Sequence, residues 1–141
     1  SIWYVRERDY TGIFETEYHQ DLYGFLDFCK SPECEFLDED LERLRVQLEG
    51  AIDRFLGAIG RHTFPQKINV SWNRIPRDPM RDPELLAWFG QKADSKEEFD
   101  QLIKEQRENI REVGEELNRL ADQMCDAYNE FIRQGRRRLA V

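Results

Sequence analysis

The sequence predicts an all-α protein, an elongated three- to four-helix bundle with one long C-terminal coiled-coil-like helix and an ordered Pro/aromatic strap. Three observations predict this class. Apolar residues recur at three- and four-residue steps in three segments, the spacing that places side chains on one face of a helix. Four of the five prolines are confined to residues 61–94. The length of 141 residues and the 40% hydrophobic content suit a single domain with its own core.

The N-terminal half is expected to contain a lead over residues 1–14 and a helical pair over residues 15–60. The first helix should end at Ser31-Pro32, because proline disfavours helical geometry in the residue before it. Its helically spaced side chains are Phe14, Tyr18, Leu22, Phe25, Leu26 and Cys29.

The second helix of the pair has a clear start and a plausible end. Asp38 can cap the free backbone N–H groups, and the acidic residues after it favour the positive end of the helix dipole. Gly60 is the expected C-terminal cap, and Pro65 reinforces the stop. Between these ends the apolar stripe consists of Leu41, Leu44, Leu48, Ile52, Phe55 and Ile59.

Residues 61–94 combine prolines with aromatic residues and are predicted to form the ordered strap. A structureless loop of this length would be unusual inside a compact domain, so its aromatic rings are expected to pack against the helices. A short extended piece is expected near Trp72. Asp82-Pro83 matches an N-cap followed by a first-turn proline, which predicts a short helix ending near Gly90.

The last predicted helix covers residues 95–134, and residues 135–141 are expected to form a basic tail. Ser95 and Glu98 match the capping-box pattern. The apolar stripe repeats every seven residues, the period of a coiled-coil seam, with Gln106 as its polar member. The stripe consists of Phe99, Ile103, Gln106, Ile110, Val113, Leu117, Leu120, Met124, Ala127, Tyr128 and Phe131.

The net charge of −8 is unevenly distributed along the chain. Residues 15–54 carry 12 acidic and 4 basic side chains, whereas residues 60–94 carry 6 basic and 4 acidic ones. An acidic surface disfavours nucleic acid as a partner, because affinity for phosphates depends on presented Lys and Arg. The acidic segment could bind a basic partner, or it could complement the basic strap within the molecule. We favour the second interpretation.

No pattern in the sequence predicts catalysis, a metal site or a cofactor. The chain has no glycine-rich phosphate loop, nucleophile elbow or HExxH pattern. Three cysteines at loose spacing indicate reduced thiols in a reducing compartment. Cys29 and Cys34 form one loose pair, whereas structural zinc sites usually show two tight pairs. We therefore predict no catalytic, cofactor-binding or metal-binding residues.

Two groups of residues are candidates for an interaction site. The first group combines His62 with strap residues Trp72, Arg74 and Trp88, since aromatic and arginine side chains dominate interface hot spots. The alternative, which we favour, is that the rings close the core and that His62 caps a helix. The second group is the arginine run Arg136, Arg137 and Arg138, which could contact an anionic membrane or phosphates, or complement the negative end of the long helix.

The function expected from these features is that of a non-enzymatic helical interaction or scaffold domain. It would act in the cytoplasm and bind a partner helix or self-associate as a homo-oligomer. The alternative is a cytosolic regulatory or signalling domain, anchored by a membrane segment upstream of Ser1. Trp3 and Tyr4 followed by Arg6 and Arg8 match the rim of a membrane span; the alternative, which we favour, is that these rings cap the core.

Overall fold

The described part of the chain is mostly helical, as expected for the all-α class, and it also contains a small β-sheet. The structure is a computed structural model. It describes Val5, Tyr10 and residues 13–15, 19–32, 35, 36, 38–65, 72–74 and 78–138, with the backbone alone for residues 13–15, 64, 65 and 72–74.

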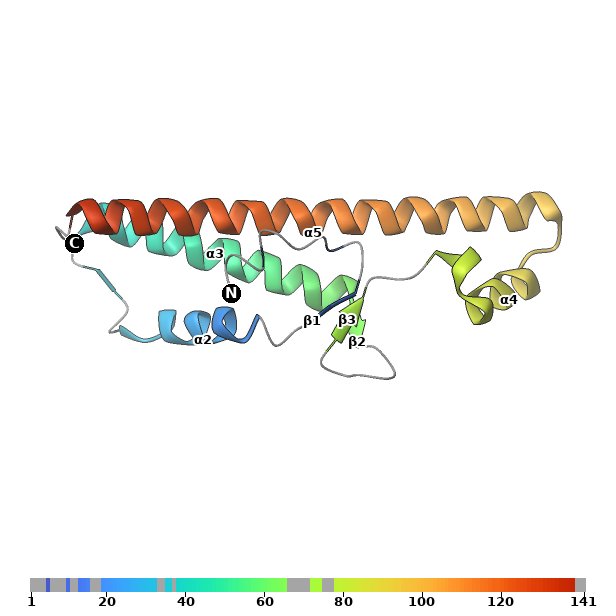
Figure 1. Cartoon of the computed structure of the whole chain (residues 1–141), viewed down its shortest axis with the longest axis horizontal. Helices are drawn as coiled ribbons and strands as arrows, with labels where there is room; N and C mark the ends of the chain where they lie inside the picture. The colour runs from blue at the N-terminus through green and yellow to red at the C-terminus, as the bar shows by residue number, and fades with distance from the viewer. Residues whose placement is uncertain are drawn as a thin grey trace.

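The molecule is long and narrow because one helix, α5 (Lys96–Arg138), runs along its whole length (Figure 1). Its 43 residues span about 64 Å at the rise of an α-helix. Helix α3 (Glu39–His62) lies antiparallel along the C-terminal part of α5, and α2 (Gln20–Cys29) packs against α3. Helix α4 (Pro83–Lys92) lies under the other end of α5.

The hydrophobic core lies between α2, α3 and the C-terminal part of α5. Phe55 of α3 and Leu117 and Met124 of α5 are completely buried there. Tyr10 is also fully buried, and its backbone N–H donates to Oδ1 of Asn118 on α5 at 3.0 Å. The N-terminal part of α5 extends beyond this core, so its packing depends on other elements.

Helix α3 begins as predicted and ends later than predicted. The Asp38 carboxylate accepts hydrogen bonds from the backbone N–H groups of Asp40 and Leu41 at 3.0 and 3.1 Å, which confirms the N-cap. The prediction that Gly60 caps the C-terminus is wrong, since the helix continues to His62 and Thr63 follows it. A helix tolerates an internal glycine, whereas Pro65 disfavours helical geometry in the residue before it.

The first predicted helix is shorter than its side-chain spacing suggested. Helix α2 begins at Gln20, whereas Phe14 belongs to strand β1 (Ile13–Glu15). Tyr18 lies outside the described residues. Strand β1 pairs with residues 72–74, far away in the sequence, so its backbone hydrogen bonds cannot be inferred from local spacing.

The small sheet has the antiparallel order β1-β3-β2 and lies near the C-terminal end of α3 (Figure 1). Strand β2 (Phe64–Pro65) directly follows the α3 terminus, and β3 (Trp72–Arg74) pairs with both neighbours. In this register Arg74 lies opposite Ile13 on one side and Phe64 on the other. The extended piece expected near Trp72 is therefore the central strand of the sheet.

The rest of the strap that the structure describes supports the N-terminal part of α5. A 3-10 turn, η3 (Pro79–Arg81), and helix α4 contact each other, and both contact α5. Asp82 caps α4 by accepting from the Leu85 N–H at 3.3 Å, and Pro83 occupies the first turn, as predicted. The helix continues past Gly90 to Lys92.

Helix α5 begins with the predicted cap and is longer than predicted. Ser95 Oγ accepts from the Glu98 N–H at 3.1 Å, and the Glu98 carboxylate accepts from the Asp94 N–H at 3.0 Å. The expected tail boundary at residue 135 is wrong, because the helix continues through Arg138. Arg138 donates to Asp38 at 3.0 Å and also to Asp40, so the last turn of α5 is tied to the start of α3.

Candidate interaction surfaces

The first hollow on the surface is a groove of about 410 Å³ between α2, α3 and α5, here called the three-helix groove. Leu22, Leu48 and Ile52 are buried at its base, and the other apolar side chains are partly exposed along its walls. Every lining side chain except Asp21 is apolar or aromatic, so the groove suits apolar side chains of a ligand. Its lining consists of Asp21, Leu22, Phe25, Leu48, Ile52, Tyr128, Phe131 and Ile132.

The charged residue that lines the three-helix groove is acidic. Asp21 lies on α2 at the groove and is exposed. A carboxylate at this position favours a ligand that carries basic side chains beside its apolar ones.

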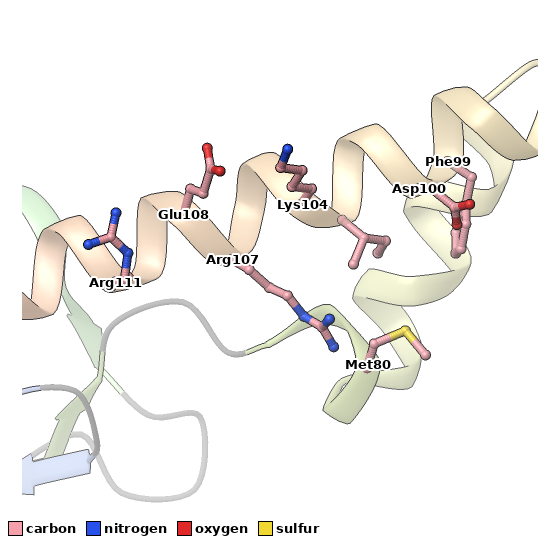
Figure 2. Close-up of a pocket in the computed structure, with 8 residues that line it drawn as sticks. Met80, Phe99, Asp100, Lys104, Arg107, Glu108 and Arg111 are labelled. Atoms are coloured by element: carbon pink, nitrogen blue, oxygen red, sulfur yellow. The ribbon is translucent and has the colours of Figure 1, made fainter.

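The second hollow, here called the α5 cleft, has a volume of about 560 Å³ and lies between η3 and the N-terminal part of α5 (Figure 2). Met80, Phe99 and Ile103 supply its apolar part, and Met80 is 55% exposed. The other lining residues carry charges. The complete lining is Met80, Phe99, Asp100, Ile103, Lys104, Arg107, Glu108 and Arg111.

Two of the charged side chains of the α5 cleft form ion pairs within the molecule, Arg107 with Asp78 and Arg111 with Glu115. Figure 2 shows Arg107 extending toward η3, where its Nε lies 3.1 Å from Oδ1 of Asp78. The pKa of Asp78 is held below its usual value by the Met80 backbone N–H and by Arg107. Lys104 and Glu108 point away from η3 in the same view.

His62 lies at the end of α3 and contacts Glu116 of α5. Its Nε2 is 3.3 Å from Oε2 of Glu116, and the two side chains are 30% and 38% exposed. His62 is the last residue of the helix, where a positive charge would interact favourably with the helix dipole. This geometry agrees with a packing role at a helix terminus.

The structure does not bring the four residues of the first candidate group together. Trp72 and Arg74 lie on β3, whose side chains are outside the described part, although the Arg74 backbone pairs with Phe64 close to His62. Trp88 lies on α4, far from the α3 terminus (Figure 1). Trp88 is 49% exposed, and Lys92 Nζ lies 4.4 Å from its ring centroid. The expectation that this ring packs into the core is therefore wrong.

The three arginines of the second candidate group form the last turn of α5. Arg138 is held by the carboxylates of Asp38 and Asp40. The Leu41 backbone N–H and the contact with Arg138 keep the pKa of Asp38 below its usual value. Arg136 and Arg137 are exposed. The position of all three at a helix C-terminus agrees with the interpretation that they complement the negative end of the helix.

Two buried polar side chains were not singled out by the sequence. The first, His19, is 1% exposed, its ring contacts Phe55 edge-on at 5.5 Å between centroids, and its Nε2 lies 3.4 Å from the Tyr10 hydroxyl. Burial lowers the pKa of His19 to about 4. His19 precedes Leu22 by three residues, the spacing of one helix face, which was the available signal for its burial.

The second buried polar side chain is Arg45, which is 8% exposed and held by two carboxylates. Its Nε and Nη2 donate to Glu42 at 2.9 and 2.6 Å, and its Nη1 donates to Glu49 at 2.9 Å. The Arg45 hydrogen bonds and the Phe36 backbone N–H lower the pKa of Glu42 to about 2. With its donors used in this way, Arg45 stabilises the packing of α3.

In the described part of the chain, no three His, Cys, Asp or Glu side chains lie close enough together to bind a metal ion. Cys29 and Cys125 are buried and form no disulfide within the described part of the chain, and Cys34 lies outside the described residues. Among the same residues, no helix is both long enough and apolar enough to cross a membrane.

Comparison with protein-family models, with curated proteins and with solved structures gives no match in any of the three. Function is therefore inferred from the two hollows, their lining residues and their charges.

Proposed function

We propose that the chain is a non-enzymatic interaction domain that binds an amphipathic helix of a partner protein in the three-helix groove. One observation carries this proposal: side chains of three helices form a groove whose lining is apolar except for Asp21. A helix laid into such a groove inserts side chains spaced at i, i+3, i+4 and i+7. Partly exposed aromatic walls formed by Phe25, Tyr128 and Phe131 supply the kind of side chain that dominates interface energetics.

The charge around the groove selects one kind of helix. Asp21 places an exposed carboxylate on the α2 side of the groove. A partner helix with an apolar stripe and a basic flank would satisfy both the apolar lining and this carboxylate, whereas an acidic helix would be repelled.

The same proposal gives a role to the seven-residue repeat of α5. Its seam residues from Val113 to Phe131 belong to the core shared with α3 or line the groove. A helix in the groove would add a further member to α2, α3 and α5 and complete an elongated four-helix bundle with coiled-coil-like packing along α5.

The test uses a labelled synthetic peptide of about 18 residues, or five helical turns, with a leucine stripe and lysines on the remaining positions. Fluorescence anisotropy should show binding of this peptide to the wild-type chain. A peptide of the same composition with scrambled order controls for general attraction to the acidic surface. Phe131→Ala should weaken binding about tenfold or more, because it removes an aromatic groove wall.

Val46→Ala is the matched control, since Val46 is 51% exposed on α3 and does not line the groove. It should bind the peptide as the wild type does. Equal binding of the ordered and scrambled peptides, or equal binding by the two variants, would contradict the proposal.

A second candidate is a cytosolic regulatory or signalling domain held at a membrane. Arg136 and Arg137 favour it, because both are exposed at one end of the molecule, and the N-terminal aromatic and arginine residues agree with it. Sedimentation with vesicles of phosphatidylcholine and phosphatidylserine tests it: Arg136→Gln with Arg137→Gln should reduce binding. Under either candidate a cytoplasmic location is proposed, as it suits Cys29 and Cys125, which form no disulfide within the described part of the chain.

A further inference from the structure

We infer that a second copy of this chain docks antiparallel on the α5 cleft, with a two-fold axis at the level of residues 105 and 106. This inference adds self-association to the proposed function. It uses the opposite end of α5 from the three-helix groove, so the two can be tested separately.

The order of charges along the cleft carries the inference. Asp100, Lys104, Glu108 and Arg111 follow one another on one side of α5 and alternate in sign. Spacings of three and four residues keep such side chains on neighbouring positions of a helix surface. From its N-terminal end, the charges of the stripe are therefore negative, positive, negative and positive.

In a symmetric pair of copies, an alternating stripe of this length is complementary to itself only when the two copies run antiparallel. When two copies run antiparallel, Asp100 faces Arg111 of the second copy and Lys104 faces Glu108, and symmetry repeats both pairs. The midpoints of the two pairs along the helix differ by half a residue, or about 0.75 Å, so one axis serves both. In a parallel, in-register arrangement each charge would face its own copy and be repelled. The charge order thus favours the antiparallel dimer.

The charges of the stripe are available for a second copy. Asp100, Lys104 and Glu108 are exposed, and within the described part of the chain none of them forms an ion pair. Arg111 donates to Glu115 at 3.0 Å through Nη1, and its guanidinium has further N–H groups to offer. Arg107 is already paired with Asp78 and does not disturb the alternation.

The apolar part of the cleft gives the second copy something to bury. Met80 is 55% exposed and lies beside Phe99 and Ile103. In the antiparallel arrangement the apolar flanks of the two copies lie on the same side of the dimer, because the two-fold axis maps each flank onto the same flank of the other copy. Ion pairs would then fix the register, and the apolar contact would add affinity.

Sedimentation velocity over a micromolar to millimolar concentration series provides the test. The wild type should dimerise, and raised salt should weaken the dimer. Lys104→Glu brings a new carboxylate opposite Glu108 twice in each dimer, and Glu108→Lys brings a new ammonium group opposite Lys104 twice. Each single variant should therefore associate at least about 30-fold more weakly than the wild type, since like charges face each other.

The decisive measurement mixes the two single variants. In the mixed pair the carboxylate introduced by Lys104→Glu faces the ammonium group introduced by Glu108→Lys. The two remaining native side chains, Lys104 and Glu108, face each other as in the wild type, so a heterodimer should form although neither variant dimerises alone. The double variant Lys104→Glu with Glu108→Lys should dimerise by itself for the same reason. A monomeric wild type, or single variants that remain monomeric after mixing, would overturn the inference.

Two exposed positions on α5 outside the cleft supply matched controls. Arg119→Glu and Asp122→Lys make the same changes in net charge as the cleft variants and should dimerise like the wild type. If they lose the dimer too, a general charge effect explains the result and the inference fails. The groove variant Phe131→Ala should also dimerise normally. If the wild-type chain dimerises but binds the ordered and scrambled peptides equally, only the proposed function is refuted.

Discussion

A buried imidazole is easier to accommodate in its neutral form, and His19 illustrates the consequence for stability. Its ring lies between Tyr10 and Phe55 in the core, and burial brings its pKa from 6.5 down to about 4. The unfolded chain therefore binds a proton on this residue at a higher pH than the folded chain does. Protonation of His19 opposes folding.

The free energy of unfolding should consequently fall as the pH drops from 6.5 toward 4. At pH values above 6.5 both states carry a neutral ring and His19 adds no pH dependence. Between the two pKa values the loss should approach about 1.4 kcal/mol per pH unit. Urea unfolding at a series of pH values measures this slope.

His19→Gln supplies the comparison, because glutamine removes the titrating group and keeps a polar side chain. The carboxylates titrate in both proteins, so the difference between the two curves isolates His19. The variant should show a shallower fall between pH 6.5 and 4. Parallel curves would mean that the buried ring does not control acid stability.

Arg45 shows how far residue-scale inference from the sequence can go. Glu42 and Glu49 lie three and four residues from Arg45, a spacing that allows ion pairs on one helix face, and both pairs are present. The burial of Arg45 depends on what packs over this face of α3, which its own segment does not encode. Local partners could therefore be inferred, whereas the degree of burial could not.

At the scale of single elements, the three helix starts marked by capping residues and the extended piece near Trp72 were predicted well, whereas the start of α2 and strand β1 were not. Asp38, Asp82 and Ser95 cap their helices by contacts within a few residues, so the sequence alone is enough to identify them. Strand β1 forms only because β3 pairs with it across a long stretch of chain. Its apolar spacing is equally compatible with a helix, which is why Phe14 was placed in one.

Helix α5 should contribute very unequally to stability along its length. Leu117 is completely buried between α3 and α5, whereas Leu102 is only partly buried in the region that extends beyond the core. Leu117→Ala should lower the free energy of unfolding by about 2–5 kcal/mol, through lost burial and the cavity left behind. Leu102→Ala should cost clearly less, and urea unfolding compares the two. Similar losses would contradict the unequal packing of α5.

At the scale of the whole molecule, the elongated shape has a direct measurable consequence. A compact domain of 141 residues would have a radius of gyration of about 14 Å. A uniform rod as long as α5 has a radius of gyration of about 18 Å, because 43 helical residues span about 64 Å. Small-angle X-ray scattering on the Lys104→Glu variant, which should stay monomeric, measures this value. A radius near that of a compact domain would contradict the extended arrangement of α5.

Charge segregation was visible in the sequence, but its partner within the molecule was not. The basic strap was expected to complement the acidic helices. In the described residues, the base from another element that reaches the acidic start of α3 is Arg138, from the opposite end of the chain. The same reasoning applies to the candidate site. The residues of each hollow come from segments far apart in the sequence, and none of the residues named as interaction candidates lines either hollow.

One consequence of the uninterrupted α5 helix concerns distance. The groove residues Tyr128–Ile132 and the cleft residues Asp100–Arg111 lie on the same helix, which contains no proline. Their midpoints are separated by about 37 Å at the rise of an α-helix. A stiff connection fixes this separation, unlike a flexible linker, whose ends sample many distances. Two copies joined at the cleft would hold their grooves about 70 Å apart, facing opposite ends. Such an assembly would fix the distance between two bound partners.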